Sequence, residues 1–272
     1  MNNINGLSLF LSIADCNLEL SFEQGENNYY ADKLQKEVRQ HFAGFLFNHK
    51  PRQVDGKIIL ENTFIIDSLK ANENQKLAFY QKLFTASGKY TLTANSMLSL
   101  YELEIVIRHL VEKLLIGRGL CLHASGVVYN NEAYLFLGPS GVGKSTIVRL
   151  LKNRNIQPIA DDSLYLVKKS KAYFVYQTTM HDKEQKVPKN KTAYKLGRIF
   201  FLQQSPEFSL ETLKNKTTIL KALLSQVWMH EENVAQTVRQ ITDLLKGAAP
   251  FQTLAFAKNK SRLKKLFESA LL

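Results

Sequence analysis

The fold is decided by the stretch Tyr134-Leu135-Phe136-Leu137-Gly138-Pro139-Ser140-Gly141-Val142-Gly143-Lys144-Ser145-Thr146. Its first four residues are apolar, as in a buried strand, and its last residues open an amphipathic helical pattern that runs to about residue 153. Between the two, Gly138 to Ser145 matches the phosphate-binding pattern G-x-x-x-x-G-K-[ST] in full. A strand, a glycine-rich loop and a helix in this order predict a P-loop and an α/β fold.

Each residue type in this loop has a chemical reason. Glycines let backbone N–H groups converge on phosphate oxygens, and the helix that follows adds the positive end of its dipole. Lys144 brings a mobile charge to the β- and γ-phosphates, and the Ser145 hydroxyl is a ligand for Mg²⁺. The loop therefore predicts binding of a nucleoside triphosphate, taken to be ATP with Mg²⁺. The residues expected to bind it are Gly138, Pro139, Ser140, Gly141, Val142, Gly143, Lys144, Ser145 and Thr146.

Two acidic residues, Asp161 and Asp162, follow the apolar run Ile156–Ala160. Asp161 comes 17 positions after Lys144 (161 − 144), which leaves room for one helix and a return strand. One carboxylate of such a pair can help to hold Mg²⁺, and the other can accept a proton from an attacking hydroxyl. A solvated turn is the plain structural alternative. We expect Asp161 and Ser145 at the metal and Asp162 as the base, although the two acids can exchange these roles.

His123 lies in the apolar run Cys121–Tyr129, which is followed by the turn at Asn130-Asn131 and by the strand that leads into the loop. Taken by itself, a histidine in an apolar strand is more often a hydrogen-bonded core residue than a catalytic one.

Three segments together resemble the catalytic domain of the HPr kinase/phosphorylase family. They are Leu122–Val128, which begins Leu-His-Ala, then Leu137–Thr146, and Ile159–Ser163, which contains Ala-Asp-Asp. That family shares its nucleotide-binding core with ATP-dependent phosphoenolpyruvate carboxykinase and includes protein-serine kinases. The resemblance implies a P-loop kinase-like domain with a mixed sheet flanked by helices. It also implies that one of the two acids activates a serine hydroxyl and that His123 lies at the phosphate site.

The resemblance covers about Leu120 to Val167 well, and Arg198 to Ala257 only weakly. The Gly-rich, Glu-containing signature that follows the acidic pair in the family is missing, so phosphorylase activity and the HPr substrate are not expected here. The segment in its place is rich in lysine, which fits contact with an acidic substrate, contact with the triphosphate, or an exposed loop. Its basic residues include Lys183, Lys186, Lys189, Lys191 and Lys195.

The pattern of apolar residues divides the chain into three parts. Residues 1–95 are expected to form an α/β region of unknown role, residues 96–119 a linking helix, and residues 120–272 the HPr kinase-like domain. The expected strands are Leu7–Ile13, Lys57–Leu60, Thr63–Ile66, Cys121–Tyr129, Ala133–Leu137, Ile156–Ala160, Leu164–Val167, Tyr173–Tyr176, Arg198–Gln203 and Phe251–Ala257. The expected helices are Ala31–Phe42, Met97–Ile116, Lys144–Asn153, Thr217–Met229, Asn233–Lys246 and Ser261–Leu271.

Composition limits the partners. Lys and Arg number 36 against 24 acidic residues, a net charge of +12, which favours anionic partners. Nucleic acid ranks last, because the charge is not interleaved with aromatic residues. No apolar run approaches the ~18 residues of a transmembrane helix. Two cysteines, Cys16 and Cys121, are too few for a disulfide framework, and we expect a cytoplasmic protein.

The leading hypothesis is a Mg-dependent kinase that transfers phosphate from ATP to a hydroxyl, that of serine in a peptide or protein. A kinase of a small molecule such as free serine is one alternative, and a non-catalytic ATP-binding sensor or assembly module is another. Neither an Asn-Lys-x-Asp nor a Leu-Ser-Gly-Gly-Gln motif is present, which argues against a GTPase or an ABC-type ATPase. Ring assembly among members of the family implies a homo-oligomer.

Overall fold

The computed structural model describes residues 7–23, 28–61, 83–180, 187–228, 233–247 and 251–271. The described residues form two compact units. The N-terminal unit takes its residues from 1–114, 179–181 and 189–191, and the C-terminal unit takes the others, from residue 115 onward. The predicted strand Thr63–Ile66 lies outside the described residues, as do Lys183 and Lys186. The predicted domain limits at residues 95 and 119 stay predictions.

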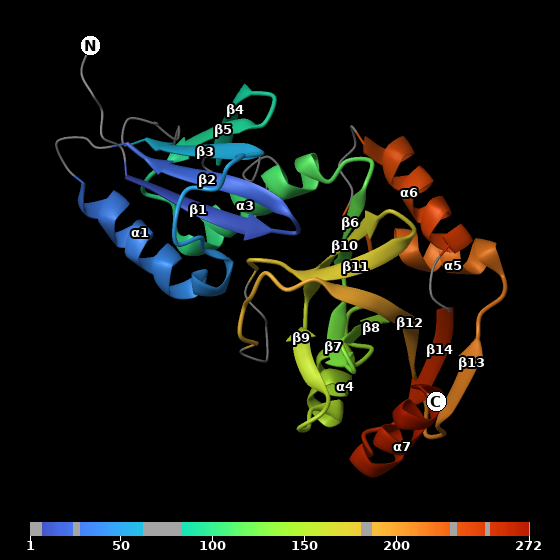
Figure 1. Cartoon of the computed structure of the whole chain (residues 1–272). Coiled ribbons are helices and arrows are strands. Elements are labelled where there is room, and N and C mark those ends of the chain that lie inside the picture. The colour runs from blue at the N-terminus through green and yellow to red at the C-terminus, as the bar shows by residue number, and fades with distance from the viewer. Residues whose placement is uncertain are drawn as a thin grey trace, which may run out of the picture. The chain divides into compact units, whose positions relative to one another are not determined.

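The N-terminal unit contains a five-stranded mixed sheet with the order β1-β2-β3-β5-β4 (Figure 1). Inward-facing and outward-facing residues alternate along β1 and β2, which makes one face of each strand apolar. Its strands are β1 (Leu7–Ile13), β2 (Cys16–Phe22), β3 (Gly56–Glu61), β4 (Phe84–Gly88) and β5 (Thr91–Asn95).

Two helices pack in this unit. Helix α1 (Tyr29–His41) buries Ala31, Leu34 and Val38, at spacings of three and four residues. Helix α3 (Leu100–Leu114) contacts α1 and β3. Its start three residues after the predicted Met97 is explained by a capping box, because Ser99 Oγ accepts the Glu102 N–H (3.3 Å) while the Glu102 carboxylate accepts the Ser99 N–H (2.8 Å).

The C-terminal unit contains a nine-stranded mixed sheet. Its longest path has the order β6-β10-β11-β12-β8-β7-β9, and β14 lies between β12 and β13. Strand β12 runs parallel to β8 and to β14, and the other pairings are antiparallel. The strands are β6 (Gly119–His123), β7 (Ser125–Tyr129), β8 (Glu132–Leu137), β9 (Gln157–Ala160), β10 (Ser163–Lys169), β11 (Ala172–Gln177), β12 (Tyr194–Gln204), β13 (Ser209–Thr212) and β14 (Phe251–Phe256).

Helices cover both faces of this sheet. Alternate residues of β8 enter different cores, Leu135 and Leu137 on one face and Tyr134 and Phe136 on the other. Helices α5 (Lys216–Leu224) and α6 (Val234–Gly247) close the first core. Helices α4 (Lys144–Leu151) and α7 (Lys260–Leu271) close the second. The predicted fold class, α/β with a mixed sheet flanked by helices, is confirmed.

Two of the predicted elements need correction. The expected strand Cys121–Tyr129 is two strands, β6 and β7, interrupted at Ala124. The expected helix Thr217–Met229 ends at Leu224, because Val227 leaves the helix and bridges Leu122 on the edge of β6. The turn at Asn130-Asn131 is confirmed, since both residues have positive φ (49° and 62°) and join β7 to β8 as a hairpin.

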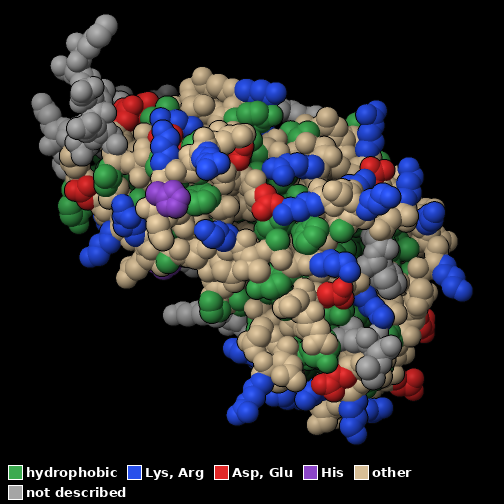
Figure 2. Space-filling model, in the orientation of Figure 1, with side chains coloured by type: hydrophobic (Ala, Val, Ile, Leu, Met, Phe, Trp, Pro, Cys, Tyr) green, Lys and Arg blue, Asp and Glu red, His purple; other side chains and the backbone are tan. Residues whose placement is uncertain are grey.

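Lys and Arg side chains are spread over the face shown in Figure 2, with acidic side chains between them. In the described parts of the chain, no helix combines the length and the apolar character that crossing a bilayer requires.

Candidate functional site

The loop predicted to bind phosphate joins the end of β8 to the first residue of α4. Three of its glycines have positive φ, at Gly138 (148°), Gly141 (81°) and Gly143 (107°). A Cβ atom at Gly143 would lie 3.0 Å from Cζ of Phe256, and one at Gly138 would lie 2.9 Å from Cγ1 of Val142. Both positions therefore need glycine for conformation and for space, and the loop keeps the concave backbone typical of a phosphate-binding nest.

Lys144 is the first residue of α4, and its side chain is folded back over the loop. Its Nζ atom donates to the carbonyls of Gly138 (2.7 Å) and Pro139 (3.3 Å), and the residue is 8% exposed. The amine is thus held beside the nest and within the protein. Ser145 follows it in the first turn of the same helix.

Two interrupted strands meet beside the loop. The chain breaks its strand pairing at Ala124, between β6 and β7, and again at Asp161-Asp162, between β9 and β10. The two breaks are joined by hydrogen bonds: the Ala124 N–H donates to the Asp162 carbonyl (3.1 Å), and Ser125 Oγ donates to the Asp161 carbonyl (2.7 Å). Because His123 pairs with Ser163 in the register of β6 and β10, the histidine and the acidic pair come to one level of the sheet.

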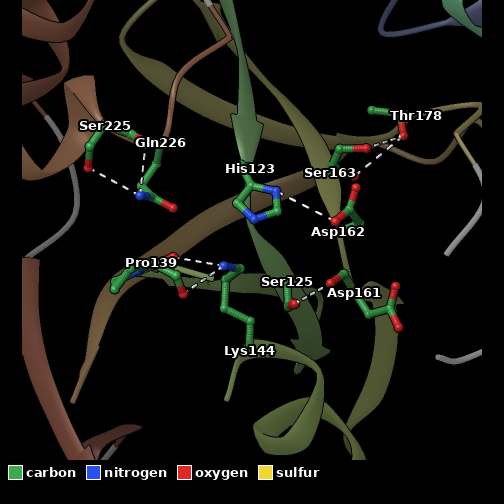
Figure 3. A network of polar contacts seen from close by, with 11 residues as sticks. His123, Ser125, Pro139, Lys144, Asp161, Asp162, Ser163, Thr178, Ser225 and Gln226 are labelled. Atoms are coloured by element: carbon green, nitrogen blue, oxygen red, sulfur yellow. Dashed lines mark hydrogen bonds and ion pairs between the residues drawn. The ribbon is translucent and has the colours of Figure 1, made fainter. Parts of the chain in front are cut away.

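The side chains of His123 and Asp162 point toward each other (Figure 3). Nδ1 of His123 lies 3.6 Å from Oδ1 of Asp162, and their side chains are 27% and 17% exposed. Asp161 is buried, and in Figure 3 its carboxylate points to the opposite side, away from Lys144. The structure therefore brings Lys144, His123 and Asp162 toward one space and turns Asp161 out of it.

Gln226 belongs to the same network and was not predicted from the sequence. Its backbone carbonyl accepts the N–H of His123 (2.7 Å), and its side-chain Nε2 donates to the carbonyl of Ser225 (3.0 Å). The Ser225 carbonyl can only accept, so the side-chain amide of Gln226 has to present Nε2 to it. Oε1 of Gln226 therefore points away from Ser225. Among the described residues, this buried oxygen has no hydrogen-bond partner. Gln226 follows an ordinary amphipathic helix, so no local sequence signal marks it.

No group of three or more His, Cys, Asp or Glu side chains that could hold a metal ion by themselves occurs in the described residues. The residues that could offer Mg²⁺ an oxygen ligand are Ser145 and the acidic pair, and the phosphates of a bound nucleotide would complete the set. The three positive-φ glycines and the retracted Lys144 amine fit a triphosphate in the nest.

The comparisons with known proteins give two findings. A family model described as "SynChlorMet cassette protein ScmC" matches residues 90–247. Among solved structures, the HPr(Ser) kinase/phosphatase from Coxiella burnetii is similar to this chain at 12% sequence identity and a TM-score of 0.31, over 55% of this chain and 95% of the other. A likeness at that level does not bear on activity. None of the curated proteins matches.

The match to the ScmC family model includes the P-loop, His123, both acidic residues and Gln226. It spans more than half of the 272 residues. The chain therefore belongs to the ScmC family.

Proposed function

We propose that the C-terminal unit is a kinase that transfers the γ-phosphoryl group of ATP to a hydroxyl group, that of serine in a peptide or protein. The observation that carries the proposal is the His123–Asp162 pair, whose side chains lie toward the same space as the P-loop lysine (Figure 3). A loop that only bound a nucleotide would not need a carboxylate and an imidazole facing the same space as Lys144.

The donor side of the proposed reaction belongs to the loop. Backbone N–H groups of the nest and the N-terminus of α4 would hold the phosphates. Lys144 would leave the carbonyls of Gly138 and Pro139 and place its charge on the β- and γ-phosphates. Ser145 and an acidic side chain would hold Mg²⁺, which would supply positive charge to the phosphates.

The acceptor side belongs to the interrupted strands. The Asp162 carboxylate would accept the proton of the attacking hydroxyl, and His123 would hold that carboxylate in place through its ring nitrogen. Asp162 is favoured over Asp161 as the base because it points into the space beside Lys144, while Asp161 does not.

Gln226 supports a ligand on this side. A buried acceptor without a partner costs about 1–3 kcal/mol, so proteins retain such atoms chiefly where a ligand or water completes them. Oε1 of Gln226 would accept a hydrogen bond from an N–H or O–H of the bound acceptor. The amide N–H groups of a peptide provide donors of this kind.

The test uses γ-labelled ATP with Mg²⁺ and a lysate of the source organism, with the labelled species then purified as the acceptor. In Asp162→Asn, we expect transfer to that acceptor to fall by about 10²–10⁴-fold, the usual contribution of a general base, while ATP affinity is retained. Asp243→Asn is the matched control, because Asp243 is a half-exposed acid that pairs with Lys168 and Lys246.

Transfer by Asp162→Asn at the wild-type rate would show that the base is a different group. ATP binding without turnover, with every acceptor tried, would instead favour the sensor or assembly role over the kinase.

A further inference from the structure

A pocket lies beside the P-loop, apart from the His123–Asp162 pair. It has a volume of about 460 Å³ and is lined by Gly141–Gly143 and Thr146 of the loop and α4, by Gln204–Pro206, and by Phe256–Lys258. Its volume is within the range of small-molecule sites, roughly 300–1,000 Å³. Lys144, His123 and Asp162 are not among its lining residues.

The position of this pocket follows from the topology of the sheet. Strands β8, β12 and β14 are parallel neighbours, so their carboxyl ends lie at one edge of the sheet. The loop follows β8, while Gln204–Pro206 begins at the last residue of β12 and Phe256–Lys258 begins at the last residue of β14. His123 and the acidic pair lie instead next to the strands on the other side of β8, because His123 comes two residues before β7, which pairs with β8, and Asp161 directly follows β9, which pairs with β7. The loop therefore lies between the pocket and the acceptor side.

Hydrogen bonds and packing connect the residues that line the pocket to the loop. Gln204 Nε2 donates to the carbonyl of Gly141 (2.9 Å), and the Ser205 N–H donates to the carbonyl of Phe256 (3.1 Å). Phe256 also lies directly against the backbone of Gly143. A ligand in this space would touch the phosphate-binding backbone itself.

The chemistry of the lining suits a nucleoside. Val142, Pro206 and Phe256 provide apolar surface for a flat base, while Thr146, Ser205 and Lys258 provide polar groups for hydroxyl and phosphate oxygens. The acceptor does not fit here, because its hydroxyl has to reach Asp162 on the other side of the loop. A triphosphate laid along the loop would place its γ-phosphate toward Lys144 and the rest of the molecule toward the pocket.

We infer that this pocket binds the nucleoside part of the triphosphate, an inference that rests on the proposed function. The sheet thus separates the ends of the donor: the base and ribose lie over the carboxyl ends of β12 and β14, and the reacting phosphate lies beside the interrupted strands.

The experiment compares the binding of ATP and of inorganic tripolyphosphate by calorimetry in the full chain. Tripolyphosphate has the same run of phosphates and no nucleoside. In wild type, we expect ATP to bind on the order of tenfold or more tightly than tripolyphosphate, because the pocket adds contacts. In Ala257→Trp, the indole fills the pocket, so that ATP affinity falls to that of tripolyphosphate while tripolyphosphate affinity is unchanged. Ala172→Trp, at a half-exposed alanine at the start of β11 away from the pocket, is the control and should bind both as wild type does.

The possible results distinguish a failure of the nucleoside pocket from a failure of the proposed function. If wild type binds ATP no more tightly than tripolyphosphate, the pocket does not take the nucleoside, and this result needs no variant. If Ala257→Trp keeps the wild-type preference for ATP, the nucleoside lies elsewhere. If neither ligand binds to wild type, the proposed function itself fails, and the inference fails with it.

Discussion

The β1–β2 hairpin of the N-terminal unit and the interrupted strands of the C-terminal unit use strand pairing differently. In the hairpin, seven consecutive residue pairs run from Leu7↔Phe22 to Ile13↔Cys16 without a break. Beside the P-loop, the pairing stops at Ala124 on one strand and at Asp161-Asp162 on the other. An unbroken ladder sends side chains alternately to the two faces of a sheet. An interruption releases this constraint, and here it places an imidazole and a carboxylate side by side.

The largest effect that would test this contrast is expected at Gly143, where the loop ends and α4 begins. Gly143→Ala places a Cβ against Phe256 at a φ of 107°, so it should cost about 1–3 kcal/mol of unfolding free energy and weaken ATP binding on the order of tenfold. Gly88→Ala is the matched change at the end of β4, where φ is not positive and the nearest atoms belong to the Thr91 side chain. It should change stability by less than about 0.5 kcal/mol. Thermal unfolding measures the stability of the two variants, and calorimetric titration measures their ATP affinity. Equal effects of Gly143→Ala and Gly88→Ala would contradict the prediction that Gly143 has a special role.

A smaller effect is expected from the hydrogen bond that joins the two interruptions. Ser125→Ala removes the bond from a fully buried hydroxyl to the Asp161 carbonyl, and should lower the free energy of unfolding by about 1–2 kcal/mol. Ser12→Ala in β1, within the unbroken ladder, should change it by less than about 0.5 kcal/mol. Chemical denaturation of both variants gives the comparison. A loss in Ser12→Ala as large as that in Ser125→Ala would show that the junction carries no special stability.

The smallest effect is a loss of folding stability that occurs only at alkaline pH. Burial, together with the Glu132 carboxylate that accepts from the Tyr134 hydroxyl (3.4 Å), raises the pKa of Tyr134 to about 12. Since this pKa is raised above the ordinary value of about 10, the stabilisation is complete below pH 10 and is lost as the pH rises toward 12. Between pH 9 and pH 11, wild type should lose about 1 kcal/mol more unfolding free energy than Tyr134→Phe. Parallel curves for the two proteins would contradict the assignment.

The strand, loop and helix from Tyr134 to Leu151 could be predicted because every signal there is local. The continuous apolar run of β8, the glycines of the loop and the apolar face of α4 are all contained in about twenty residues. The turn at Asn130-Asn131 was predictable for the same reason, because asparagine tolerates positive φ.

The interruption at Ala124 could not be predicted in this way. Residues 121–129 read as one apolar strand, and the break depends on bonds to Asp161 and Asp162, more than thirty positions later in the chain. Gln226 was missed for a related reason, since it leaves α5 only because the edge of β6 binds the backbone of residues 226–228. Strands β4 and β13 are short and largely exposed, so pairing with their neighbours defines them rather than their own sequences. Strand β2 was also not predicted, although buried apolar residues and more exposed residues alternate clearly along its sequence.

The interrupted strands also have a consequence for the behaviour of the protein at high concentration. Because β6 continues into β7 and β9 into β10, the two ends of the sheet path are connected by the chain itself. Residues 226–228 cover the outer side of β6, and Gln177 Nε2 donates to the Ile159 carbonyl on β9 (2.7 Å). The strand edges left on the described sheet are β9 and β13, each four residues long, and β13 carries Glu211. Exposed strand edges promote edge-to-edge association, and a short charged edge resists it. The interruptions that position the proposed catalytic residues thus also leave this nine-stranded sheet with only short strand edges for association with other molecules.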